Sequence, residues 1–188
     1  LPTIGSKELV AWLPTILEAK HMLYPDIAYP TYLVGGLIAR AQSVAVSFDT
    51  STWSAADMAW INTPSNPTGR VHSEAELAEV IDFSRRTQTI IVSDECYLHF
   101  PSAPSVKPRS LLSVAGGDNR NLLICYSLSK RSNIAGYRAG LIIGDPELIS
   151  KIREFRKHAG MLVPAPVQAA MVAALRDEEH VSAQASRY

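Results

Sequence analysis

The sequence predicts an α/β protein in three layers, α/β/α, with a mostly parallel sheet. Three observations support this fold class. Short apolar runs, each about the length of one strand, alternate with longer segments whose apolar residues repeat at helical spacing. Helix start signals stand between these runs. Polar residues capable of chemistry follow several runs, at the ends of strands where open α/β sheets bind their ligands.

Five apolar runs are expected to form strands. They are Val44–Phe48, Met58–Asn62, Thr89–Ser93, Leu122–Tyr126 and Gly140–Ile143. Because strands alternate with helices, we expect them to pair mostly in parallel and to be buried on both faces.

Amphipathic segments supply the helices. Ser73 and Glu76 form a capping box ahead of an apolar stripe. Pro146, directly after Asp145, marks the first turn of another helix. The segment 5–19 also has helical spacing, with a kink expected at Pro14.

The composition is that of an ordinary globular protein. Of 188 residues, 18 are Lys or Arg and 18 are Asp or Glu, and 47% are hydrophobic. This balance gives no electrostatic argument for a nucleic acid or membrane partner. Cys96 and Cys125 lie on or beside predicted strands, which indicates buried free thiols. With no apolar run long enough for a membrane span and no signal segment, we expect a cytoplasmic protein.

Other sequence features carry less chemistry. The Pro/Ser-rich stretch 100–109 is expected to be a surface loop. The chain starts without methionine and stops within a helical pattern, so we expect it to be a fragment. None of the histidines has metal-ligand spacing, and we expect no metal site. They are His21, His72, His99, His158 and His180.

The segment Ser127–Lys130, followed by Arg138, is the most informative part of the chain. It comes directly after a predicted buried strand and brings two hydroxyls and one amine to the strand end. Such a lysine can clamp a phosphate or form a Schiff base with a carbonyl. The phosphate-loop glycine pattern is missing, which weakens the first use. A carbonyl cofactor that carries a phosphate would need the donors found here.

Three further segments place polar residues at strand or loop ends. They are 62–69 with the sequence NTPSNPTG, 93–97 with SDECY, and 5–8 with GSKE. One segment of this kind is a coincidence, whereas four in one chain form a set that indicates a single binding site.

Together these segments resemble the class I/II aminotransferases, which are fold type I enzymes dependent on pyridoxal 5′-phosphate (PLP). The resemblance covers most of the chain and is carried by Ser65–Gly69, Asp94–Tyr97, Ser127–Lys130 and Arg138. Within that family, the segments 5–10, 129–133 and 157–168 look like those of actinobacterial N-succinyldiaminopimelate aminotransferases.

The resemblance implies catalytic roles. Lys130 would hold PLP as a Schiff base and move the proton at the substrate α-carbon, for which its amine must lose its charge. Asp94 would pair with the pyridine nitrogen and keep it protonated. Tyr97 and Asn66 would donate to the cofactor's phenolic oxygen.

The resemblance also implies a phosphate-binding site. Ser6 and Lys7 would bind the phosphate through main-chain N–H groups at a helix N-terminus. Ser127, Ser129 and Arg138 would complete it. Tyr32 matches the aromatic residue that stacks on the cofactor ring, with an ordinary core tyrosine as the alternative.

The resemblance assigns residues 1–176 to a PLP-binding large domain, incomplete at its start. Residues 177–188 would begin the connection to a small C-terminal domain, which supplies the arginine for the substrate carboxylate. The expected partner is a second copy of the chain in a homodimer. Residues 158–164, small, apolar and proline-containing, would reach the neighbour's active site, with packing inside their own subunit as the alternative.

The implied reaction moves an amino group from L-glutamate to a keto acid. The leading substrate is N-succinyl-2-amino-6-oxopimelate, in diaminopimelate and lysine biosynthesis. Alternatives are a broad aspartate- or alanine-type aminotransferase and another diaminopimelate-pathway aminotransferase. A PLP-binding sensor domain of a transcription regulator also stays open. A nucleotide-binding domain would lack its glycine fingerprint and leave Lys130 unexplained.

Overall fold

The computed structural model describes residues 1–100 and 107–187. Within them, the strands are β1 (Pro2–Ile4), β2 (His21–Pro25), β3 (Gln42–Val46), β4 (Met58–Asn62), β5 (Ile90–Asp94), β6 (Leu122–Ser127) and β7 (Ala139–Gly144). The helices are α1 (Gly5–Ile16), α2 (Thr31–Ala39), α3 (Glu74–Thr87), α4 (Leu111–Val114), α5 (Leu128–Arg131), α6 (Pro146–His158), α7 (Ala165–Arg176) and α8 (Glu179–Arg187). Short 3₁₀ turns form at Thr50–Thr52 and Ala135–Tyr137.

The described strands form one sheet in the order β1-β7-β6-β5-β4-β2-β3. From β6 to β3 every neighbouring pair is parallel, whereas β7 runs antiparallel to both β6 and β1. The predicted three-layer, mostly parallel α/β fold is therefore confirmed.

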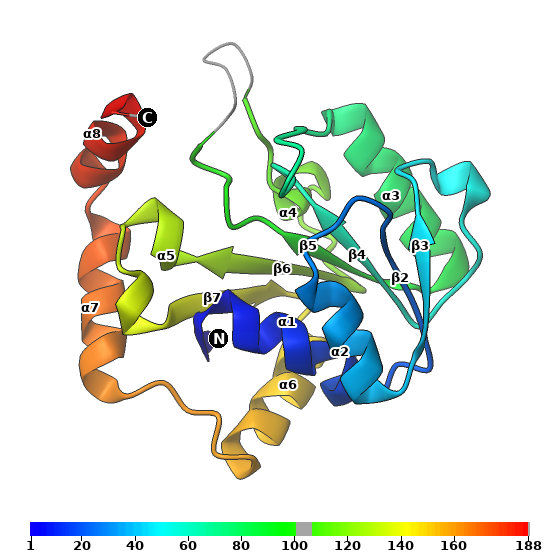
Figure 1. The fold of residues 1–188 in the computed structure, drawn as a ribbon, viewed down its shortest axis with the longest axis horizontal. Coiled ribbons are helices and arrows are strands. Elements are labelled where there is room, and N and C mark those ends of the chain that lie inside the picture. The colour runs from blue at the N-terminus through cyan, green and yellow to red at the C-terminus, as the bar shows by residue number, and fades with distance from the viewer. Residues whose placement is uncertain (101–106, 188) are drawn as a thin grey trace.

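Helices cover both faces of the sheet. In Figure 1, α3 and α4 lie above it, while α1, α2 and α6 lie below. Side chains of β4 divide between the two layers, because neighbouring residues of a strand point to opposite faces. Trp60 packs with Leu13 of α1, whereas Ile61 packs with Phe83 of α3. The fully buried β4 is the centre of the core.

The predicted helix starts are present. The Ser73 side chain accepts from the Glu76 N–H, and Glu76 reaches back to the Ser73 N–H, so the capping box is complete. Asp145 caps α6 by accepting from the N–H groups of Glu147 and Leu148. The helix that contains Pro14 ends at Ile16 rather than Ala19.

Some strand boundaries differ from those expected. Strand β4 has the predicted ends, but β3 spans Gln42–Val46 rather than Val44–Phe48. Strands β1 and β2 were not predicted, because β1 has only three residues and β2 includes His21 and Pro25. Most of the expected loop 100–109 lies outside the described residues.

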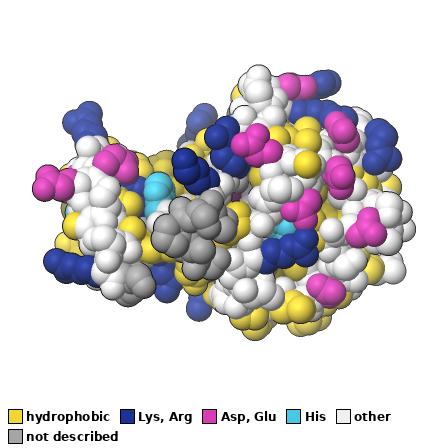
Figure 2. Space-filling view, turned by 90° about the horizontal axis from the view of Figure 1, so that it is seen from above, with side chains coloured by type: hydrophobic (Ala, Val, Ile, Leu, Met, Phe, Trp, Pro, Cys, Tyr) yellow, Lys and Arg dark blue, Asp and Glu magenta, His cyan; other side chains and the backbone are white. Residues whose placement is uncertain are grey.

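No helix in the described part of the chain is both long and apolar enough to span a bilayer. Figure 2 shows one face of the molecule, on which positive and negative side chains are interspersed. Cys125 is buried in β6 and Cys96 is half-buried after β5, and both are free thiols.

Candidate active site

The carboxyl ends of β4, β5 and β6 meet at one edge of the sheet, because these strands are parallel and adjacent. A cavity of about 340 Å³ lies there, and we call it the Lys130 cavity. Nine of the ten predicted site residues line it: Ser6, Lys7, Asn66, Asp94, Tyr97, Ser127, Ser129, Lys130 and Arg138. Tyr29, Asn62, Cys96 and Ala135 also line it.

Tyr32 does not line this cavity. Its ring is 1% exposed and stacks on Trp60, with the ring centroids 5.0 Å apart. The expected stacking of Tyr32 on the cofactor ring does not fit this position. Tyr29, three residues earlier and outside α2, lines the cavity instead. Both tyrosines stand at the same turn, and the sequence did not indicate which one faces inward.

Lys130 is exposed at the cavity, on the short helix α5 directly after β6. Its Nζ atom lies 5.9 Å from the centroid of the Tyr97 ring. In the described residues, no hydrogen bond or ion pair engages this amine. The Ser127 side chain caps α5 by accepting from the Ser129 N–H at 3.1 Å. The two serines and the lysine are thereby held in one turn.

Asp94 ends β5 and is 6% exposed. Its Oδ1 accepts from the Cys96 N–H at 3.1 Å, and its Oδ2 accepts from the Tyr32 hydroxyl at 2.9 Å. Burial raises the pKa of the Asp94 carboxyl, and the hydrogen bonds from Cys96 and Tyr32 oppose that rise. Burial also raises the pKa values of Cys96 and Tyr97, so both stay protonated near neutral pH.

Asn62, at the end of β4, orders the loop that carries Asn66. Its amide donates to the carbonyl of Asp94 at 2.8 Å, and its Oδ1 accepts from the Asn66 N–H at 2.6 Å. Asn62 thus ties the loop after β4 to the end of β5. The sequence assigned no role to Asn62, although its place at the end of a predicted strand was a signal that it could belong to the site.

The N-terminus of α1 reaches the cavity through close backbone approaches. A Cβ on Gly5 would lie 2.3 Å from the Arg138 Nη2 atom, and a Cβ on Gly140 would lie 3.0 Å from the Ser6 nitrogen. Gly5 also has a φ of +70°, which favours glycine. No side chain caps α1, so its first-turn N–H groups stay available to an anion beside Arg138.

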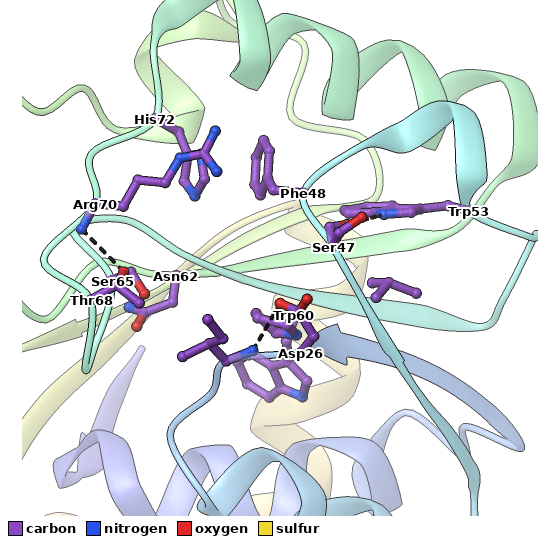
Figure 3. Close-up of a pocket in the computed structure, with 13 residues that line it drawn as sticks. Asp26, Ser47, Phe48, Trp53, Trp60, Asn62, Ser65, Thr68, Arg70 and His72 are labelled. Carbon is purple, nitrogen blue, oxygen red and sulfur yellow. Dashed lines mark hydrogen bonds between the residues drawn. The ribbon is translucent and has the colours of Figure 1, made fainter.

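A second cavity of about 100 Å³ lies at the same edge, beyond Asn62, and we call it the Arg70 cavity (Figure 3). Arg70 donates to Glu76 Oε1 at 2.5 Å, and its guanidinium lies 5.9 Å from the Phe48 ring centroid. His72 stacks on Phe48, with the ring centroids 3.5 Å apart. This cavity is smaller than usual ligand pockets, and its arginine already has partners.

A lysine, a buried aspartate and an uncapped helix start at one edge of a three-layer α/β sheet match the groups that a PLP-type transferase site requires. The sequence matches the family of class I and II aminotransferases over residues 3–188, and the chain belongs to that family. Enzymes of this family use PLP, and the lysine, carboxylate and phosphate-binding donors of the Lys130 cavity fit that cofactor.

Relatives agree with this assignment. The chain is 46% identical to the 4-dedimethylamino-4-oxo-anhydrotetracycline transaminase OxyQ of Streptomyces rimosus, covering 100% of this chain and 54% of OxyQ. It is also 46% identical to a probable aminotransferase of Mycobacterium tuberculosis, covering 100% and 46%. The N-succinyldiaminopimelate aminotransferase structure of M. tuberculosis matches with a TM-score of 0.87 at 25% identity, covering 100% and 53%. The chain thus spans about half the length of these relatives.

Proposed function

We propose that this chain is the cofactor-binding part of a PLP-dependent aminotransferase. The reaction moves an amino group between L-glutamate and 2-oxoglutarate on one side and a keto acid on the other. The observation that carries the proposal is the convergence of Lys130, Asp94 and Arg138 on one cavity at the sheet edge. In this division, residues 1–176 form the large domain and residues 177–188 begin the connection to a small domain.

The phosphate group of the cofactor would bind at the start of α1 under this proposal. The main-chain N–H groups of Ser6 and Lys7 would donate to it, with the positive end of the helix dipole behind them. Ser127 and Ser129 donate hydroxyls, and Arg138 adds a charge-assisted hydrogen bond. The Lys7 side chain also lines the cavity, with its Nζ atom 5.8 Å from the Tyr29 ring centroid.

Three polar groups of the cavity would hold the ring of the cofactor. Asp94 would accept the hydrogen bond of the protonated ring nitrogen, and Tyr97 and Asn66 would donate to the phenolic oxygen. PLP supplies an electron sink for the substrate's α-carbon. Lys130 would hold the cofactor through its amine and, once the amino substrate has displaced that amine, would be placed to move the proton at the substrate's α-carbon.

The leading keto-acid substrate is N-succinyl-2-amino-6-oxopimelate, in diaminopimelate and lysine biosynthesis. Its support is the similarity to the M. tuberculosis structure and the segments 5–10, 129–133 and 157–168. A second candidate is a cyclic ketone of the kind that OxyQ's name describes, because OxyQ shares 46% identity with this chain. A substrate panel on the full-length protein, followed by the loss of PLP absorbance, separates these two from aspartate- or alanine-type activity.

We further propose a cytoplasmic homodimer whose loop 158–164 reaches the second subunit's site. Leu162 in this loop is 63% exposed, which supports contact with another surface. The base of the loop is fixed to α1, because Arg156 bonds to Glu8 Oε1 at 2.8 Å and to the Met161 carbonyl at 3.1 Å. Complementation between a Lys130→Ala subunit and a subunit with a bulky charge at Gly160 tests whether the sites are shared.

Replacement of Lys130 tests the proposed function directly. In the full-length protein, Lys130→Ala should lose borohydride-trappable PLP and at least about 10³-fold of the transamination rate, because attachment and proton transfer use the same amine. Lys7→Ala removes another lysine of the same cavity and should keep the trappable attachment. A trapped adduct on Lys130→Ala, located on a different lysine, would refute the assignment.

A further inference from the structure

Tyr32 is a buried polar residue to which the reaction described above gives no role. It lies in the first turn of α2, behind the cavity wall, and its ring is held by Trp60 and edge-on by Tyr29. Its hydroxyl donates to Oδ2 of Asp94 at 2.9 Å, a hydrogen bond that joins α2 to the end of β5.

The Asp94 carboxylate is therefore bonded on both oxygens by the protein. Tyr32 holds one oxygen and the Cys96 N–H holds the other. Each carboxylate oxygen can accept two hydrogen bonds, so acceptor capacity remains for a donor in the Lys130 cavity, which Asp94 lines.

The direction of this hydrogen bond is fixed by the surroundings. Burial, followed by the nearby Asp94 charge, raises the pKa of the Tyr32 hydroxyl well above its ordinary value. Tyr32 therefore keeps its proton and acts as a donor, for which the matching acceptor is the ionised form of Asp94. Other titratable groups near Asp94 in the described residues are Cys96, Cys125, Tyr97 and Glu95. Burial is the main cause that raises the pKa values of the two thiols and of Tyr97, which remain neutral, and it raises the pKa of Glu95 to about 7.

We infer that Tyr32 is a positioning residue that keeps the Asp94 carboxylate ionised and turned toward the Lys130 cavity. The consequence of this arrangement rests on the proposed function. An ionised Asp94 facing the cavity keeps the ring nitrogen of the cofactor protonated. Without the Tyr32 hydroxyl, Asp94 becomes the stronger base and takes up that proton. The ring nitrogen is then neutral, and the cofactor is a weaker electron sink.

Simple packing is the competing explanation, because the Tyr32 ring fills space beside Trp60. The two explanations differ in what the hydroxyl does. Tyr32→Phe keeps the ring and removes only the donor. Tyr126→Phe is the matched control, because it removes a half-buried hydroxyl that lies 2.5 Å from His99 Nε2 and does not contact Asp94.

The first measurement uses the full-length protein without PLP. Carbon-13 labelling of aspartate carboxyls gives the pKa of Asp94, whose resonance is assigned by its loss in Asp94→Asn. We expect Tyr32→Phe to raise this pKa by about one unit, because a hydrogen bond to a charged group is lost. Tyr126→Phe should leave it unchanged. In the unmutated protein, the Tyr32 ζ-carbon resonance should move as Asp94 titrates.

The second measurement uses the same proteins with PLP labelled with nitrogen-15 in its ring. Tyr32→Phe should move the ring-nitrogen resonance toward that of the unprotonated ring and lower kcat about tenfold, with little change in KM. In an Asp94→Asn background, Tyr32→Phe should add no further loss, because both residues act through one carboxylate.

The outcomes separate the two proposals. An unchanged Asp94 pKa in Tyr32→Phe overturns the inference whether or not PLP binds. An additive loss in the double mutant overturns it as well, because it assigns Tyr32 to packing. A raised Asp94 pKa in a protein that binds no PLP supports the Tyr32–Asp94 coupling and refutes the proposed function alone.

Discussion

The two cavities at the carboxyl edge of the sheet differ in how their charged side chains are used. In the Arg70 cavity the charge is satisfied within the chain, because Arg70 pairs with Glu76. In the part of the chain that the structure describes, Lys130 of the Lys130 cavity has no hydrogen-bond or ion-pair partner, and the Arg138 guanidinium bonds only to the Ala135 carbonyl, at 2.9 Å. The first arrangement stabilises the fold, and the second leaves donors free for the ligand that we propose.

The helix starts beside these cavities show the same difference. Helix α3 begins with a complete capping box, so its first N–H groups are bonded within the chain. Helix α1 begins at Gly5 without any side-chain cap. An uncapped start costs stability, because a capping side chain contributes about 1 kcal/mol. The comparison teaches that donors left without partners at this edge mark the binding site better than charge alone does.

Among the substitutions that test this difference between the two cavities, Asp94→Asn is expected to have the largest effect. The full-length mutant should still bind PLP but lose about 10²–10³-fold in kcat, because a neutral partner does not hold the ring nitrogen protonated. Steady-state kinetics measure this loss. Asp82→Asn, an exposed position on α3, is the control. A rate within about threefold of the unmutated protein would show that Asp94 has no catalytic role.

In the Arg70 cavity, the corresponding effect is on stability and comes from His72. Burial, together with Arg70, lowers the pKa of His72 from 6.5 to about 4. Between these two pH values the unfolded chain binds a proton at His72 that the folded chain does not. The free energy of unfolding should therefore fall as the pH drops from 6.5 to 4, by about 3 kcal/mol at most.

Urea denaturation of the full-length protein across that pH range measures the His72 contribution. His72→Gln should remove this part of the pH dependence while leaving PLP affinity unchanged. The same slope in His72→Gln would assign the pH dependence to other groups.

A smaller effect is expected from Gly5→Ala. The added Cβ would displace the Arg138 guanidinium, so the affinity for PLP should fall by about tenfold, the loss of one charge-assisted hydrogen bond. Titration of the full-length protein with PLP measures the change. Gly136→Ala is the control, because a Cβ there meets nothing within 4 Å. Equal affinities for the two variants would contradict this account of the α1 start.

The smallest effect is expected from Ser73→Ala, which removes the capping box of α3. The free energy of unfolding should fall by about 1 kcal/mol, with PLP affinity unchanged. Urea denaturation measures this loss. Ser54→Ala changes an exposed serine away from any helix start and should change neither quantity. Weaker PLP binding by Ser73→Ala would show that the start of α3 is not independent of the start of α1, and would contradict the comparison between them.

The sequence predicted the three-layer sheet and most of the Lys130 cavity for one physical reason. In a parallel sheet, strand ends converge, so residues that follow strands come together in space. Asn66, Asp94 and Lys130 each follow a strand or its loop, and all three line the cavity. Gly5 was visible as the start of an amphipathic segment, and Ser6, which follows it, lines the same cavity.

The sequence could not separate Tyr29 from Tyr32. Both are aromatic residues at one turn, and which ring faces the cavity depends on how α2 packs against Trp60. Strand β1 escaped notice because a three-residue strand has too little periodicity to detect. Its pairing with β7 is set by tertiary contacts, as is the approach of Gly140 to Ser6.

The contact between Gly5 and Arg138 has a consequence for the order in which the site can form. The helix start at Gly5, where we propose the phosphate to bind, is made before Arg138 and β7, which leave the ribosome more than 130 residues later. Among the described strands, β1 pairs with β7 alone, so the strand that precedes α1 joins the sheet only when β7 is present. If the proposed site is correct, a nascent chain completes it only after β7 emerges, because the contact between Gly5 and Arg138 closes a long stretch of chain.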